Sequence, residues 1–173
     1  TYGKMMADDQ VKAALTLKKD AVLSTGWDVE PASDSPLDIE VADFVKYNFE
    51  AMEGSLDDNL LGILSALGYG YSLTELVFKP IIEGQFAGKL GYRALKTRLP
   101  HDFLFVVDQH DNLLADGVEQ FGVRLPAWKF AIYSANAEFS NWYGTSDLRA
   151  CYRSWWFKDN VLKWWGMYLD RYG

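Results

Sequence analysis

Residues 146–172 read SDLRACYRSWWFKDNVLKWWGMYLDRY, and this stretch decides how the chain is organised. It contains no proline and a single glycine, Gly166, so it predicts one uninterrupted helix about 40 Å long. Four of the seven tryptophans of the protein lie within it. Such a concentration of large side chains predicts contacts with more surface than one small core offers.

On a helical wheel, the apolar side chains of this stretch fill an arc of roughly 200°, wider than the stripe of an ordinary surface helix. Lys158 falls inside the arc, so we expect it to find a partner or to extend its ammonium group into water. Four other basic residues gather in a strip about 80° wide. They are Arg149, Arg153, Lys163 and Arg171.

Three interpretations of this wheel stay open. The helix is a core helix whose basic strip faces water, or a Trp-rich helix on a membrane surface, or a helix packed between identical neighbours. Membrane-surface helices place Lys and Arg along both borders of a wide polar face, which differs from a narrow strip. In the third interpretation the strip faces the lumen of a ring.

The overall charge limits the classes of partner. The 173 residues carry a net charge of −7, which argues against a general nucleic-acid binder, because phosphate binding needs clustered Lys and Arg. Residues 144–173 nevertheless carry five basic and three acidic side chains. Contact with a polyanion is therefore expected only in this part of the chain.

Residue counts disfavour several other functions. The single cysteine, Cys151, excludes an internal disulfide and fits a reducing compartment. Two histidines and one cysteine do not supply a zinc ligand set, and we expect neither a metal nor a cofactor. No apolar run approaches the ~20 residues of a membrane span, so we expect no membrane partner.

The residues before 144 alternate between helical and strand patterns, which predicts an α+β fold with helices packed on short antiparallel strands. The long C-terminal helix follows this part. Helices are expected over residues 8–24, 37–52 and 55–67, strands over 27–30, 71–82 and 128–133, and a hairpin over 104–115.

Two acidic positions invite a catalytic or metal-binding interpretation. Glu75 is the one acid in a strongly apolar strand, but no partner acid or nucleophile follows at a recognisable spacing, so a pairing with Arg is the better interpretation. The segment from Asp108 to Asn112 is typical of a hairpin turn rather than of a metal site. We therefore predict no catalytic residue, and we interpret Cys151 as a small packed side chain.

Several short motifs are spread along the chain. They are WDVEPA at residues 27–32, GYGYSLTE at 68–75, RLP at 124–126 with KF at 129–130, WYGTSDLR at 142–149, Tyr152, and WWFK at 155–158. In order and spacing these motifs resemble those of Mu-like phage portal proteins. The resemblance extends from about residue 5 to residue 173.

The resemblance implies a portal subunit that forms a ring, usually a dodecamer, for packaging and ejecting double-stranded DNA at one capsid vertex. It implies a wing-like domain over residues 1–143 and a first stem helix over 144–173. The clip, the second stem helix and the crown would belong to a longer chain. Implied partners are the large terminase subunit, which supplies the ATPase, and the major capsid and head-completion or adaptor proteins. The implied location is the virion, and the host cytoplasm during assembly.

Within this interpretation the helix supplies two sets of candidate residues. The basic strip of Arg149, Arg153, Lys163 and Arg171 is expected to contact DNA in the channel without sequence preference. Competing roles for the strip are intersubunit pairing with Asp147, Asp159 or Asp170, and plain solvation. The residues expected to pack between subunits are Trp155, Trp156, Trp164, Trp165 and Tyr168.

Two functions from other classes remain as alternatives. One is a non-viral α+β interaction domain that binds a protein partner through its Trp-rich helix. The other is a hydrolase that uses Glu75 with a second carboxylate. The first would give a small particle without a ring form, and the second would lose turnover on Glu75→Gln.

Overall fold

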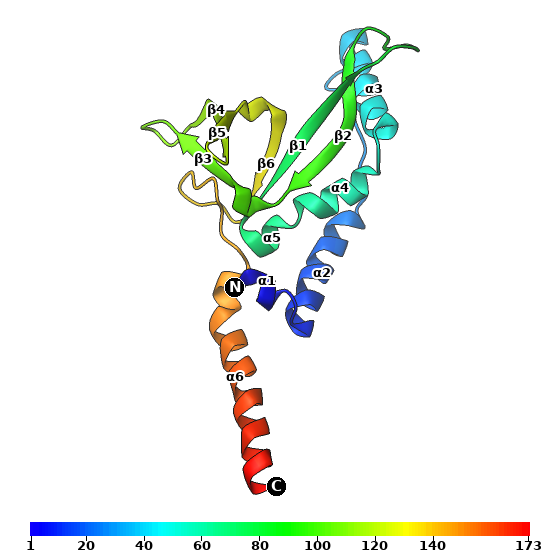
Figure 1. Cartoon of the computed structure of the whole chain (residues 1–173). Helices are drawn as coiled ribbons and strands as arrows, with labels where there is room; N and C mark the ends of the chain where they lie inside the picture. Colours follow the sequence, from blue (N-terminus) through cyan, green and yellow to red (C-terminus); the bar gives the residue numbers. More distant parts are fainter.

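The computed structural model describes residues 1–173 as an α+β body from which one long helix projects (Figure 1). Short 3-10 turns at Pro100–Asp102 and Ala127–Lys129 connect some of the strands. The helices are α1 (Tyr2–Met5), α2 (Asp9–Leu23), α3 (Pro36–Ala51), α4 (Leu56–Ile63), α5 (Ala66–Tyr69) and α6 (Leu148–Tyr172). The strands are β1 (Tyr71–Pro80), β2 (Leu90–Arg98), β3 (Phe103–Val107), β4 (Leu113–Gln120), β5 (Val123–Leu125) and β6 (Phe130–Ser134).

Two small antiparallel sheets form the centre of the body. One has the strand order β2-β1-β6 and the other β3-β4-β5. The predicted fold class, helices on short antiparallel strands followed by a long terminal helix, is thereby confirmed. Strand β1 is central because it pairs with β2 along most of its length and with β6 at its beginning.

The hydrophobic core lies between the two sheets. Tyr71 and Leu73 of β1 pack there against Phe103, Phe105 and Val118 of the second sheet. The hydroxyl of Tyr71 donates a hydrogen bond to Pro100 O and also lies 3.3 Å from Phe103 O, and burial raises its pKa to about 12. Ser72 and Thr74, which alternate with Tyr71 and Leu73, are also fully buried, so both faces of β1 are covered at its start, where α4 and α5 contact the strand.

Helix α3 packs on the β1–β2 hairpin through one buried polar side chain. The side-chain amide of Asn48 accepts a hydrogen bond from Tyr92 N at 2.8 Å and donates one to Phe44 O at 2.7 Å. Phe44 also meets Phe86 of the hairpin loop edge to face, with ring centroids 5.1 Å apart. Asn48 therefore ties α3 to the edge strand β2.

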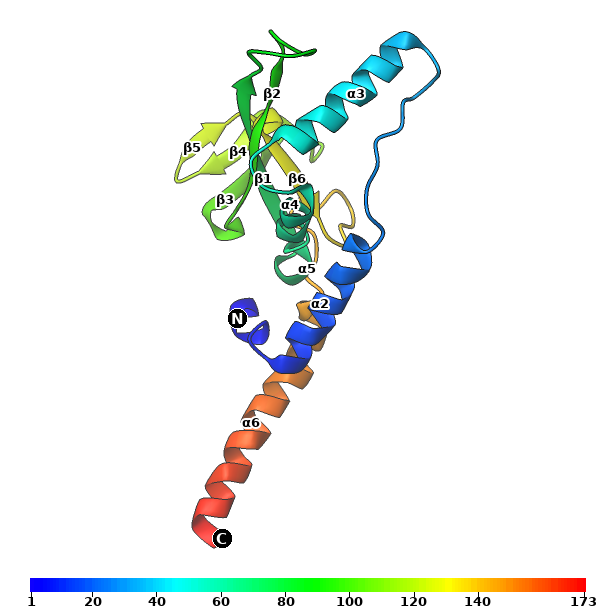
Figure 2. The same ribbon diagram turned by 90° about the vertical axis from the view of Figure 1, so that its right-hand side faces the viewer.

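Helix α6 leaves the body at the end opposite the β1–β2 hairpin, as two views at right angles agree (Figures 1 and 2). Only its first turns lie beside α1 and α2. Leu148 is the only buried residue of the helix. The interpretation of this stretch as a core helix is therefore wrong for the single chain.

Three local predictions need correction. Residues 27–30 form no strand, since no partner strand lies beside them, and Trp27 packs on Phe49 of α3 with ring centroids 5.8 Å apart. The helix expected over 55–67 is divided into α4 and α5. The strand expected from Trp128 begins at Phe130, after a 3-10 turn.

Replacing Asn48 with Ala should lower the free energy of unfolding by about 1–3 kcal/mol, because the buried amide of Tyr92 would lose its acceptor. Urea unfolding followed by circular dichroism measures this change. Asn59→Ala is the control, since the Asn59 side chain bonds only to Ser55 O at the start of its own helix. Equal losses in both variants would contradict the role of Asn48 as a tie between elements.

Candidate functional site

The joint between the body and α6 is built from backbone hydrogen bonds. Thr145 N donates to Ala135 O at 2.7 Å, and Asp147 N donates to Leu67 O at 3.0 Å. The buried Ser146 hydroxyl donates to Gly68 O at 2.7 Å and accepts from Leu148 N at 3.1 Å. The start of α6 is thus fixed to both α5 and the end of β6.

Close backbone approach in the joint requires glycine at position 144. Gly144 has φ +56°, and a Cβ there would lie 2.3 Å from Gly70 O and 2.4 Å from Ala135 O. Both contacts are with backbone atoms, which cannot rotate away. Any larger residue would push the start of α6 away from the body.

Three ion pairs, made by two lysines, hold α2 beside the first half of α6. Lys18 Nζ lies 2.9 Å from Asp147 Oδ2, and Lys158 Nζ lies 2.8 Å from Asp8 Oδ2 and 3.2 Å from Asp9 Oδ1. Lys158 has therefore found a partner, as its position in the apolar arc predicted. Because the lysine of each pair is exposed to solvent, each pair holds α2 more weakly than buried packing would.

The Asp8–Lys158 pair shifts the titration of both groups. The hydrogen bond from Lys158 lowers the pKa of the Asp8 carboxyl below its ordinary value of 3.8. The same hydrogen bond to Asp8 raises the pKa of Lys158 above 10.5. Asp8 also caps α2, since its carboxylate accepts from Gln10 N and Val11 N.

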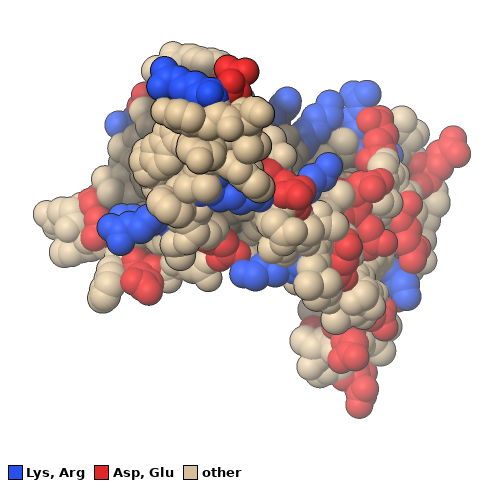
Figure 3. Space-filling model, turned by 90° about the horizontal axis from the view of Figure 1, so that it is seen from below, with Lys and Arg blue, Asp and Glu red and all other residues tan.

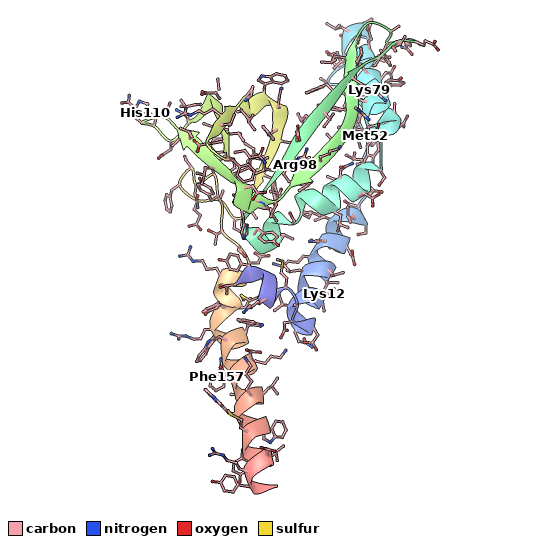
Figure 4. The ribbon with its side chains drawn as sticks, in the orientation of Figure 1. Lys12, Met52, Lys79, Arg98, His110 and Phe157 are labelled. Carbon is pink, nitrogen blue, oxygen red and sulfur yellow. The ribbon has the colours of Figure 1, made fainter.

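Beyond Val161 the helix carries its apolar side chains into open solvent. The exposed fractions of seven large apolar side chains between Leu162 and Tyr172 range from 51% for Trp164 to 73% for Tyr172. Monomeric proteins rarely expose contiguous apolar surface of this extent, so it marks an interaction site. We call residues 162–172 the free part of α6. Figure 4 shows Phe157, about one turn before it, just below α1 and α2.

The five residues predicted to pack between subunits divide along the helix. Trp155 is half-buried, because α1 and α2 lie beside its turn. Trp156 is exposed on the same turn, and Trp164, Trp165 and Tyr168 are exposed on the free part. Within one chain, four of the five therefore leave about half or more of their surface exposed, from 47% for Trp156 to 60% for Trp165 and Tyr168.

The basic strip remains at the surface. Lys163 forms an i,i+4 ion pair with Asp159, which compensates its charge within the helix. Arg149, Arg153 and Arg171 are exposed and form no ion pair within the chain.

Figure 3 shows acidic side chains gathered on the right, the side on which α2 and α3 lie in Figure 1.

The structure shows the surroundings of three further residues singled out in the sequence. Glu75 pairs with Arg98, whose Nε lies 2.9 Å from Glu75 Oε2, as the pairing interpretation expected. The Asp108 carboxylate accepts from His110 N at 2.7 Å and from Asn112 N at 2.9 Å, which confirms the hairpin turn. Cys151 is half-buried, and its thiol lies within hydrogen-bonding distance of Asp147 O and Leu148 O.

The sequence did not reveal the residues of the joint. Met5 is fully buried on α1, which contacts α6, and Met6 packs on Gly68. The helical pattern indicated only a start near Asp8, and methionines before it give no pattern of their own. Two glycines flanking aromatic residues, Gly70 and Gly144, were the available signal of a close approach.

The chain contains no cluster of three His, Cys, Asp or Glu side chains arranged to hold a metal ion. None of its helices combines the length and the apolar character needed to cross a membrane.

Gly144→Ala should destabilise the protein by about 3 kcal/mol or more, because its methyl group would collide with two carbonyl oxygens. Gly88→Ala is the matched control, since Gly88 has φ +85° but nothing within 4 Å of an added Cβ. The control should cost only about 1–2 kcal/mol of left-handed backbone strain. Equal decreases in the free energy of unfolding of the two variants, measured by urea unfolding, would contradict the proposed crowding in the joint.

The Asp8–Lys158 pair should stabilise the fold at neutral pH and lose this effect in acid. A carboxyl whose pKa is lowered on folding stabilises the protein above its unfolded pKa of about 3.8, and this contribution is lost as pH falls through the folded value. Asp8→Asn keeps a capping oxygen but removes the charge. The difference in unfolding free energy between wild type and Asp8→Asn should therefore shrink from pH 7 to pH 3. A difference that stays constant with pH would contradict this linkage.

A comparison with protein families gives one match that covers the whole chain. The family model described as "Portal protein of Mu bacteriophage" matches residues 1–173. The matched region therefore includes the body, the joint and the free helix. It also includes every motif on which the sequence resemblance rested.

Proposed function

Because the chain belongs to the Mu bacteriophage portal protein family, we propose that it assembles into a ring that conducts double-stranded DNA into and out of the capsid. The observation that carries this proposal is the free part of α6. A helix with seven large apolar side chains at least half exposed requires further protein surface around it. Identical neighbours in a closed ring would supply that surface at both flanks of the helix.

In this proposal residues 1–143 form a wing-like domain and residues 144–173 form the first stem helix. The joint supports this division, because the crowded backbone at Gly144 separates the body from α6 at that point. The usual dodecameric ring of the family is the stoichiometry we propose.

The basic strip is proposed to face the channel and to contact the DNA backbone without sequence preference. Arg149, Arg153 and Arg171 have charges that no acid of the chain compensates, whereas Lys163 is compensated by Asp159. The acidic excess outside residues 144–173 supports a conduit that DNA passes through rather than binds tightly.

The proposed role is structural, as expected for a portal, and includes no reaction catalysed by this chain. The large terminase subunit would dock on the ring and supply the ATPase. Major capsid and head-completion proteins would bind it in the virion, with assembly taking place in the host cytoplasm.

Negative-stain imaging of the portal protein tests the ring directly. The expected result is ring-shaped particles with a central channel, together with a sedimentation coefficient far above that of a monomer. Particles that remain monomeric at micromolar concentration would contradict the proposal and favour the interaction-domain alternative.

Reversal of Arg149 and Arg153 to Glu should reduce DNA packaging and weaken its dependence on salt, because two phosphate contacts per subunit become repulsive. Reversal of Lys12 and Lys96, which are exposed on α2 and β2, changes the net charge equally and serves as the control. If the rings still form and packaging is unchanged when Arg149 and Arg153 are reversed, the proposal that the basic strip faces the channel is contradicted.

A further inference from the structure

Gly166, in the last third of α6, makes no contact that would explain a glycine within the chain. Gly166 lies on an exposed part of the helix, and nothing approaches within 4 Å of the position a Cβ would occupy. Glycine in a helix interior costs roughly 1 kcal/mol relative to alanine. The missing side chain therefore calls for an explanation outside the single chain.

Four faces of α6 can be placed relative to one another. Successive helical residues are about 100° apart, so Lys158, which points to α2, lies nearly opposite Arg149 of the basic strip. Gly166 lies between these two faces on one flank of the helix. The opposite flank carries an apolar ridge, formed by Phe157, Val161, Trp164 and Tyr168.

The two flanks are complementary in shape. On the ridge, Phe157, Trp164 and Tyr168 are exposed, and their aromatic side chains are larger than that of Val161. On the other flank, Gly166 leaves a notch between Leu162 and Asp170, which are its i−4 and i+4 neighbours. A ridge of this kind packs into such a notch when two helices lie side by side.

The two flanks are also complementary in charge. Arg171 borders the ridge, and Asp170 borders the notch, and neither forms an ion pair within the chain. If two copies lie parallel, Arg171 of one meets the notch flank of the next near Asp170. Because ridge and notch lie on opposite sides of one helix, the contact cannot be completed by two copies facing each other.

We propose that the ridge of Phe157, Trp164 and Tyr168 docks against Gly166 of a second copy of this chain. The contact is heterologous, because it joins different flanks of two parallel helices, and it is repeated around the ring. The proposal rests on the proposed function, since the occupant of the notch is the neighbouring portal subunit. An Arg171–Asp170 pair across the contact takes Arg171 out of the DNA-facing strip. Arg149 and Arg153 remain as the strip's uncompensated cations.

Cysteine cross-linking tests the contact in the assembled portal protein. With Cys151 replaced by Ser, Trp164→Cys and Gly166→Cys are made separately and then combined in one chain. The combined variant should give a ladder of disulfide-linked oligomers on non-reducing gels, whereas each single variant should give monomers. The two cysteines of one chain cannot bridge to each other, because they lie on opposite flanks of the helix.

The outcomes separate this inference from the proposed function. Rings that form without a ladder would overturn the inference and leave the ring intact. Dimers from Gly166→Cys alone would also overturn it, since they require two notches to face each other. Absence of rings in the unmodified protein would overturn the proposed function itself.

Substitution at Gly166 supplies a second measurement. Gly166→Leu should raise the protein concentration needed for half-maximal ring assembly by about tenfold or more, which corresponds to about 1.4 kcal/mol. Its helix content should be unchanged or higher, since no atom of the chain meets the new side chain. Ala13→Leu adds an apolar side chain at an exposed position on α2, away from α6, and should leave assembly unchanged. Equal assembly of both variants would contradict the notch.

Discussion

The apolar surface of α6 is the constraint on which the remaining structure depends. One chain buries Leu148 and half-buries the residues beside α1 and α2, but it leaves the aromatic side chains beyond Val161 in solvent. Removing apolar area from water contributes about 25 cal/mol per Å², so this surface represents a large unused stabilisation. The native state of α6 is therefore completed by association rather than by folding of the single chain.

The joint explains how such a helix keeps a defined direction before it associates. Its backbone hydrogen bonds and the crowded Gly144 fix the first turn of α6 to the body. The lysines of the ion pairs to α2 are exposed to solvent, so salt weakens these pairs, and acid weakens the Asp8–Lys158 pair. Direction is thus set by rigid backbone contacts, while α2 is held by weaker electrostatic ones. A subunit built in this way presents its contact surface with little cost of ordering on association.

The sequence predicted the elements with strong periodicity and missed those defined by long-range contact. The helix predicted over residues 146–172 agrees with α6 to within two residues at each end. The prediction was accurate because the segment contains no proline and its apolar residues recur at helical spacing. Trp27 lies in an alternating segment that resembles a strand, but the segment pairs with no strand, and Trp27 packs on Phe49 of α3 instead. The roles of Met5 and Gly144 depend on residues far away in the chain. No local pattern could have placed them in the joint.

Two roles are proposed for α6, contact with DNA and packing against neighbouring subunits, and the distribution of charge on the helix suits both. Each uncompensated cation that faces DNA strengthens binding, and a ring multiplies this effect by the number of its subunits. A conduit that held DNA through four cations per subunit would resist its passage. Asp159 compensates Lys163 within the helix, and Asp170 of a neighbouring copy would compensate Arg171. In the proposed ring, acids next to the basic strip would therefore weaken its binding to DNA, and the same charges would set the register between neighbouring helices.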